Sequence, residues 1–292
     1  MESKNQPSRN NPVQKFTTLI SAAELAAVLN DPLLIVVDVR HDLGDPGLGA
    51  RKYSESHIPG ALFLSVENDL AAPRTSRTGR HPLPAPAVLA ATLSAIGVDA
   101  SKQVVAYDQA QSTYSARLWW MLRWLGHTNV AVLDGGLDAW VRRGFAVTPA
   151  LARRIPAQFI PAVSDSPVGV DTLVSHLKDI DYTIVDARGA ERFRGINETI
   201  DPVGGHIPGS HNRPYTGNLK PDNTFKDAAT LREDWLKVLA GRTSEQIVHS
   251  CGSGVTACNN ALAMQVAGLS GSRLYPGSWS EWCADPARPI AR

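Results

Sequence analysis

Short continuous apolar runs alternate with longer helical patterns along almost the whole chain. Such runs are typical of strands that are buried on both faces of a parallel sheet. They predict strands at residues 34–38, 104–107, 130–133, 183–186, 246–250 and 272–275. The stretches 22–29, 116–125 and 256–267 predict helices, and a glycine follows each of the last two. This alternation predicts an α/β fold in which each mostly parallel sheet is covered by helices on both faces.

Three segments of the first half recur in the second half, in the same order and at a nearly constant separation. The pairs are 35–40 (IVVDVR) with 183–188 (TIVDAR), 56–61 (SHIPGA) with 205–210 (GHIPGS), and 133–140 (LDGGLDAW) with 274–282 (LYPGSWSEW). A duplication over this length predicts two whole domains. We expect residues 16–147 and 169–292 to form them, with the proline-rich stretch 148–168 as a linker and the polar residues 1–15 as a disordered tail.

The composition is that of a globular protein, with 43% hydrophobic and 20% charged residues among 292. The net charge of +1 gives no reason to expect nucleic acid or an anionic membrane surface as a partner. No apolar run is long enough to cross a bilayer, and the first residues carry no apolar signal-peptide core. We therefore expect a cytoplasmic protein.

The run 247–256 (IVHSCGSGVT) carries the most chemical information. A predicted strand ends in Cys251, Gly252 and Gly254 follow, and a helical pattern begins near Thr256. The glycines let backbone N–H groups turn inward, and a helix start adds partial positive charge. Both effects favour the thiolate, which is the reactive form of cysteine. The alternative is a buried structural cysteine at a strand end, but the flanking glycines favour the reactive one.

The chain has three cysteines, Cys251, Cys258 and Cys283. Their odd number argues against a disulfide framework, and no Cys-x-x-Cys pair suggests a zinc site. We predict neither a metal nor an organic cofactor.

The duplicated His-Ile-Pro-Gly segments, the Gly-Gly…Trp and Gly-Ser-Trp…Trp endings and the Cys-Gly-Ser-Gly-Val-Thr loop resemble tandem rhodanese-like sulfurtransferases, over residues 16–289. The resemblance implies a cysteine in the second domain that cycles through a persulfide. It also implies an inactive first domain. When the strands of the two halves are aligned, Asp108 takes the position that Cys251 has in the second half. An aspartate cannot carry a transferable sulfur. The backbone N–H groups expected to cradle the persulfide belong to Gly252, Ser253, Gly254, Val255 and Thr256.

The family resemblance implies sulfur transfer from a small-molecule donor to a thiol or cyanide acceptor, with a thioredoxin-like reductant as a further expected partner. Family members that prefer thiosulfate carry basic residues just after the cysteine, whereas the neutral Gly252-Ser253-Gly254 loop favours 3-mercaptopyruvate. Thiosulfate is the alternative donor, and a non-catalytic persulfide carrier for a protein partner is a second alternative. Cysteine phosphatases carry an arginine where this chain has Ala257, so a phosphate substrate is disfavoured.

The resemblance also implies residues that bind the donor and move protons. Arg192, in the segment 192–195 (RFRG), matches the first substrate arginine of mercaptopyruvate enzymes. The segment that carries their second arginine reads NETIDP here, at 197–202. Either Arg194 replaces the missing cation, or one arginine holds the carboxylate, or the donor is different.

Ser253 is expected to act beside Cys251, in a proton relay with His57 and Asp45. His57 and Arg188 both have counterparts in the other domain, which favours a structural reading of each: a turn for the histidine and an ion pair at a strand end for the arginine.

Overall fold

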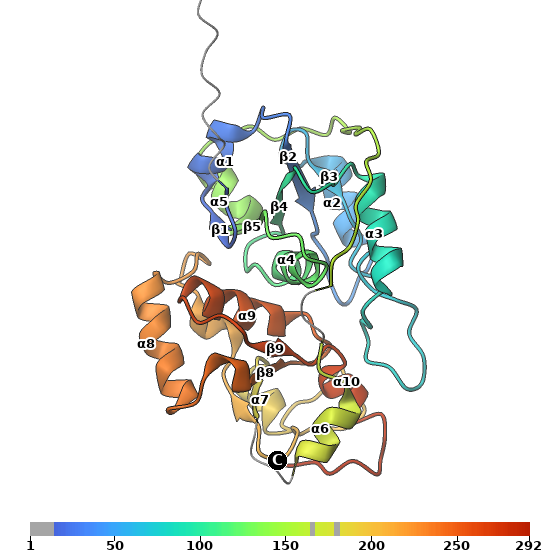
Figure 1. Cartoon of the computed structure of the whole chain (residues 1–292), viewed down its shortest axis with the longest axis vertical. Coiled ribbons are helices and arrows are strands. Elements are labelled where there is room, and N and C mark those ends of the chain that lie inside the picture. The colour runs from blue at the N-terminus through green and yellow to red at the C-terminus, as the bar shows by residue number, and fades with distance from the viewer. Residues whose placement is uncertain (1–14, 164–166, 178–181) are drawn as a thin grey trace, which may run out of the picture.

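The computed structural model describes residues 15–163, 167–177 and 182–292, and these form two α/β domains, the first above the second in Figure 1. Of the tail predicted at residues 1–15, all but the last residue lies outside the described part of the chain.

The first domain is built on a five-stranded sheet with the order β1-β5-β4-β2-β3, and every pairing in it is parallel. Its strands are β1 Leu19–Ile20, β2 Leu34–Asp38, β3 Leu62–Phe63, β4 Gln103–Tyr107 and β5 Val130–Leu133. Its helices are α1 Ala22–Val28, α2 Leu48–Glu55, α3 Pro86–Ala95, α4 Tyr114–Trp124 and α5 Gly136–Arg142.

The second domain repeats the plan with a four-stranded parallel sheet in the order β7-β6-β8-β9. Its strands are β6 Thr183–Asp186, β7 His211–Asn212, β8 Ile247–Ser250 and β9 Arg273–Leu274. Its helices are α6 Val170–His176, α7 Ala190–Phe193, α8 Ala228–Leu239, α9 Thr256–Val266 and α10 Ser278–Trp282, with short 3₁₀ turns at η1 Tyr215–Asn218 and η2 Ser244–Gln246. The predicted fold class is confirmed, and all six predicted strands form within a residue of their expected limits.

Apolar residues dominate the central strands of the first sheet because both of its faces are covered. In β4, Val104 and Ala106 pack into one buried cluster together with α4, whereas Val105 and Tyr107 pack into another together with α1 and α5. Successive side chains of a strand point to opposite faces, so both must be apolar when both faces are buried. This explains why β2, β4 and β5 appear in the sequence as unbroken apolar runs.

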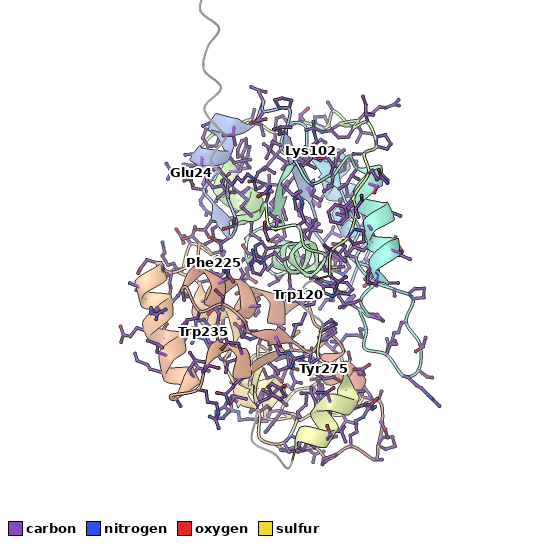
Figure 2. All side chains as sticks on the ribbon, in the orientation of Figure 1. Glu24, Lys102, Trp120, Phe225, Trp235 and Tyr275 are labelled. Atoms are coloured by element: carbon purple, nitrogen blue, oxygen red, sulfur yellow. The ribbon has the colours of Figure 1, made fainter. Side chains whose placement is uncertain are left out.

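One apolar core continues from the first domain into the second. Helix α4 packs against α9, and the cluster that holds Leu118 and Trp119 also holds Leu262 and Met264. Figure 1 shows the two helices at the junction, and Figure 2 shows the side chains between them, with Trp120 and Phe225 labelled nearby. The two domains therefore share one buried interface, formed mainly by α4 and α9. Within the described part of the chain, no helix is long and apolar enough to cross a membrane.

The Asp-x-Arg repeat makes the same contact in both domains. Arg40 Nη2 lies 2.7 Å from Asp38 Oδ2, and Arg188 Nη2 lies 2.7 Å from Asp186 Oδ2. Each guanidinium also donates to the carbonyl just before the repeated His-Ile-Pro-Gly segment, at Ser56 and at Gly205. The ion pair predicted for Arg188 is confirmed, and it connects two motifs that are distant in the sequence.

Asp108 fills the loop between β4 and α4 with its own side chain. Its carboxylate oxygens accept hydrogen bonds from the backbone N–H groups of Ser112, Tyr114 and Ser115 and from the Ser115 hydroxyl, at 2.9–3.2 Å. Burial raises the pKa of Asp108, and these hydrogen bonds oppose that rise. The loop is thus shaped to surround an acceptor group at the end of its strand.

Replacing Asp108 with alanine should destabilise the first domain. The substitution leaves three backbone donors near a strand end without their acceptor, and each buried unpaired donor costs about 1–3 kcal/mol. We expect Asp108→Ala to lower the free energy of unfolding by at least about 1–3 kcal/mol in urea titrations. Glu55→Ala, on the exposed end of α2, is the control and should change little. Equal stability of the two variants would contradict this account.

Candidate active site

Cys251 directly follows β8, and the loop after it leads into α9. Its side chain is buried, with 1% of the residue exposed. The start of α10 holds its backbone: the Cys251 N–H donates to Ser278 Oγ at 3.0 Å, and its carbonyl accepts from the Trp279 N–H at 3.0 Å. These contacts fix the cysteine between two helix starts.

The loop after Cys251 directs a backbone donor at the sulfur. The Gly254 N–H lies 3.2 Å from Cys251 Sγ. Gly254 has φ +75, and a Cβ there would lie 2.3 Å from the Pro276 carbonyl oxygen, so only glycine fits. Thr256 does not cap α9: the N-cap is Val255, and Thr256 is the first helical residue. The positive end of α9 therefore lies beside the sulfur.

A cleft of about 130 Å³ opens over the sulfur, and both domains contribute to its walls. The first domain supplies Leu43, Arg80 and Tyr114. The second domain supplies Ala187, Arg188, Gly189, Arg192, Tyr215, Cys251, Gly252, Ser253, Val255 and Thr256. The predicted nucleophile, Arg192 and most of the predicted loop are therefore brought together here.

Two arginines from different domains converge on Gly252 in this cleft. A Cβ built on Gly252 would lie 2.7 Å from Arg80 Nη2 and 3.7 Å from Arg192 Nη1. Asp201 bridges the pair, because its carboxylate forms ion pairs with Arg80 Nη1 and with Arg192 Nη2. Arg192 also pairs with Glu198. Asp201 lies in the segment where mercaptopyruvate enzymes were expected to carry their second arginine.

The arginine that lies beside Arg192 over Gly252 is Arg80, not Arg194. Arg194 is exposed and its Nε donates to the Ala190 carbonyl at 3.2 Å within its own helix region. Arg80 Nε is buried and, among the described residues, has no hydrogen-bond partner. Our prediction of Arg194 is corrected on this geometry.

A histidine of the first domain contacts the serine of the loop. His81 Nδ1 lies 2.8 Å from Ser253 Oγ, and His81 Nε2 lies 2.9 Å from Glu67 Oε1. The carboxylate fixes the ring proton on Nε2, which leaves Nδ1 to accept the Ser253 hydroxyl proton. Burial is the main cause that lowers the pKa of His81, to about 4, with the Arg117 charge acting in the same direction.

The relay predicted through His57 and Asp45 is not formed. His57 is buried against Tyr53, and its two nitrogens contact the backbone carbonyls of Tyr53 and Ala150 at 2.6 and 3.1 Å. The Asp45 side chain is half-exposed and pairs with Arg51. His81 and Glu67 contact Ser253 in their place, so the residues of the relay are corrected while Ser253 keeps its expected position.

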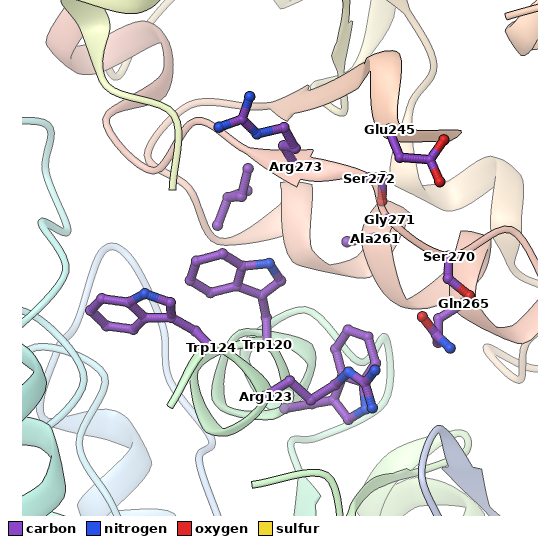
Figure 3. Close-up of a pocket in the computed structure, with 12 residues that line it drawn as sticks. Trp120, Arg123, Trp124, Glu245, Ala261, Gln265, Ser270, Gly271, Ser272 and Arg273 are labelled. Carbon is purple, nitrogen blue, oxygen red and sulfur yellow. The ribbon is translucent and has the colours of Figure 1, made fainter. Parts of the chain in front are cut away.

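A larger cavity lies elsewhere. It has a volume of about 420 Å³ and lies between the C-terminal half of α4 and the end of α9 with β9. Figure 3 shows Trp120 and Trp124 on one side and Arg273 and Ser272 on the other. No cysteine lines it. The smaller cleft over Cys251 is therefore the candidate active site.

The rhodanese-like domain model matches residues 21–143 and again residues 169–285. Two such domains, with a buried cysteine after the strand β8 of the second one, define a tandem-domain sulfurtransferase. The chain belongs to the rhodanese family.

Its relatives are enzymes named for sulfur transfer. A Pseudomonas aeruginosa protein named "Probable 3-mercaptopyruvate sulfurtransferase" is 47% identical over 94% of this chain and 97% of its own length. The thiosulfate sulfurtransferase of Cricetulus griseus is 34% identical over 80% of this chain and 79% of its own. The crystal structure of SseA from Escherichia coli, a 3-mercaptopyruvate enzyme by its description, matches with TM-score 0.78 and 31% identity, over 91% of this chain and 100% of that one.

Cys251 should be the cysteine that carries sulfur, and Cys258 provides a matched control. Cys258 is fully buried in α9, donates to the Gly254 carbonyl and has its pKa raised by burial. We expect Cys251→Ser to reduce sulfur transfer to background with the fold intact, and Cys258→Ser to retain most of it. The rate of sulfur transfer to cyanide is measured for both variants, with mercaptopyruvate and with thiosulfate as the donor. Normal turnover by Cys251→Ser would remove the assignment.

Proposed function

We propose that this chain transfers sulfur from 3-mercaptopyruvate to a thiol or cyanide acceptor through a persulfide on Cys251. The observation that carries the choice of donor is the charge balance of the cleft. Each guanidinium that lines it already has a carboxylate partner: Arg80 pairs with Asp201, Arg192 with Glu198 and Asp201, and Arg188 with Asp186. The cleft therefore offers guanidinium donors to an anion while carrying little net positive charge.

Such a cleft suits a monocarboxylate better than a dianion. Thiosulfate carries two negative charges and gains from unpaired cations close to the sulfur, whereas the loop after Cys251 has no basic residue. A single carboxylate needs only the two guanidinium nitrogens that lie close together over Gly252, Arg80 Nη2 and Arg192 Nη1. Planar guanidinium groups bind a carboxylate with parallel N–H donors. The donor's carboxylate would then lie beside the residue that follows Cys251.

The first step breaks the carbon–sulfur bond of the donor. The Cys251 thiolate attacks the donor sulfur, and the bonding electron pair leaves with the carbon as the enolate of pyruvate. The Gly254 N–H, 3.2 Å from Sγ, and the start of α9 stabilise negative charge on the resulting persulfide. Splitting the transfer into two displacements is ordinary covalent catalysis.

The donor thiol proton passes through Ser253 and His81. Ser253 Oγ accepts this proton as its own hydroxyl proton moves to His81 Nδ1, and Glu67 stabilises the imidazolium through Nε2. The same path returns the proton to the enolate carbon, which gives pyruvate. The step consumes no net proton, and the remaining product is the Cys251 persulfide.

An external acceptor removes the outer sulfur. Cys258 cannot do so readily, because burial raises the pKa of its thiol and its Sγ donates to the Gly254 carbonyl. A small thiol, cyanide or a thioredoxin-like reductant would enter through the cleft and take the sulfur. The first domain contributes walls and side chains without a reaction of its own, since Asp108 fills its corresponding loop.

The ratio of kcat/KM for the two donors, measured under identical conditions, tests the proposal. We expect mercaptopyruvate to exceed thiosulfate by at least about tenfold, which is the ratio that about 1.4 kcal/mol provides. The reverse ratio would make the chain a thiosulfate sulfurtransferase with the same nucleophile. A persulfide that forms once, without turnover on any small acceptor, would make it a carrier.

Arg80 and Arg192 should determine donor binding, and Arg194 is the matched control. We expect Arg80→Gln and Arg192→Gln to raise KM for mercaptopyruvate roughly 10–100-fold, because a charge-assisted hydrogen bond contributes about 1.5–3 kcal/mol. Arg194→Gln removes the same charge outside the cleft and should leave KM unchanged. Steady-state kinetics on the three variants decides. If Arg194→Gln raised KM as much as Arg80→Gln, the assignment would be wrong.

Loss of the relay should affect one donor selectively. Thiosulfate brings no thiol proton, so its sulfur transfer does not require Ser253 and His81. We expect His81→Gln and Ser253→Ala to lower kcat for mercaptopyruvate roughly 10²–10⁴-fold, the usual range for general acid–base catalysis, with a much smaller change for thiosulfate. Equal losses with both donors would show that these residues act only by holding the loop.

A further inference from the structure

We propose that His41, Glu67 and His81 form a binding site for a divalent transition metal such as Zn²⁺, and that the bound metal inhibits the enzyme. Within the described part of the chain, this cluster brings one ligand atom from each residue within 4.8 Å of the others. Imidazole and carboxylate are both ordinary zinc ligands. The metal would be an effector, since the proposed sulfur transfer does not use it.

Two of the three separations between ligand atoms fit a shared metal after small side-chain movements, and the third, between the two imidazoles, lies within 4.8 Å. His81 Nε2 lies 2.9 Å from Glu67 Oε1, and His41 Nε2 lies 3.6 Å from the same oxygen. Zinc bonds to nitrogen and oxygen of about 2.0–2.2 Å place two ligand atoms of a tetrahedron roughly 3.3 Å apart. Both measured separations lie within a few tenths of an ångström of that value.

His41 is the residue that no other role explains. Its side chain is 1% exposed, and its Nε2 is buried without a hydrogen-bond partner among the described residues. Edge-to-face contacts with Tyr114 and with His81 hold the ring. A buried, unpaired imidazole nitrogen normally costs stability. Here it points toward the carboxylate that a metal would share.

The surroundings give the metal both access and charge compensation. The Glu67 side chain is 35% exposed, so the cluster is open on one side. Glu67 and nearby Asp42 supply negative charge. The opposing charge is Arg117, whose guanidinium donates to the His81 carbonyl. The positive charge of Arg117 is thus outweighed by the negative charges of Glu67 and Asp42.

Metal binding would move the proton of the His81 ring from Nε2 to Nδ1. Coordination through Nε2 displaces the proton from that nitrogen, and a neutral imidazole then carries its proton on Nδ1. Nδ1 would donate to Ser253 Oγ, which it otherwise accepts from, and Glu67 would leave its contact with His81. The inhibitory effect rests on the proposed relay, whereas the binding site does not.

Binding is tested in untagged Cys251→Ala protein, in thiol-free buffer, so that no reactive thiolate competes for the metal. We expect Zn²⁺ titrated by calorimetry to form a complex of one metal per chain, and Co²⁺ to give the visible absorption of a low-symmetry site. Adding His41→Phe, which keeps the ring contact with Tyr114, should weaken binding at least about tenfold. The control His211→Phe removes an exposed histidine and should not. No stoichiometric complex, or one unaffected by His41→Phe, would overturn the site.

Inhibition is tested separately with Cys251 intact. Persulfide formation from mercaptopyruvate is followed by mass spectrometry at one fixed total zinc concentration, so that chelation by the donor is the same for every variant. We expect zinc to slow the wild-type and His211→Phe chains and to have at least about tenfold less effect on His41→Phe. Equal slowing of all three would overturn the inhibitory role. A failure of the proposed donor would instead appear as low mercaptopyruvate activity in the absence of zinc.

Discussion

The packing of α4 on α9 is the constraint on which the cleft depends, and Arg117 is its polar centre. This arginine of α4 is fully buried and, among the described residues, donates only to backbone carbonyls, those of Leu70, His81, Pro82 and Gly254. Burying a guanidinium costs several kcal/mol unless its donors are satisfied. Here one side chain fixes a loop of the first domain and the loop after Cys251 at the same time. The distance between His81 and Ser253 therefore follows from the shared core.

The duplication explains how one loop design serves two purposes. In the first domain the N–H groups after β4 converge on the Asp108 carboxylate, whereas in the second the Gly254 N–H lies on the Cys251 sulfur. Both loops join the end of a parallel strand to the start of a helix, where backbone donors are unpaired. A carboxylate built into the chain occupies this position permanently. With a cysteine there, the same position can take the outer sulfur of the proposed persulfide.

Sequence reasoning was accurate where local pattern determines structure, and it failed where the domains meet. The unbroken apolar runs gave the strands because sheets buried on both faces require them. The relay role of His57 came from the family resemblance and was wrong, whereas its recurrence as His206 had favoured a structural role: both rings stack on an aromatic residue and bond to backbone. Arg80 and His81 follow Gly79, whose missing side chain admits the Gly277 carbonyl of the other domain. No periodicity marks such a contact, and a basic loop alone reads as solvated surface.

The position of Arg80 also explains why an acidic residue, Asp201, lies in the segment 197–202. Where mercaptopyruvate enzymes are expected to carry an arginine, this chain has Asp201, and a carboxylate in an anion cleft would be unfavourable by itself. Asp201 instead holds Arg80 from the first domain beside Arg192. Burial raises the pKa of Asp201 while the Arg80 charge lowers it, so the ion pair offsets the cost of its position. Because the second cation comes from the first domain, the proposed donor site is complete only when the two domains pack together, so the proposal makes donor binding depend on the α4–α9 interface.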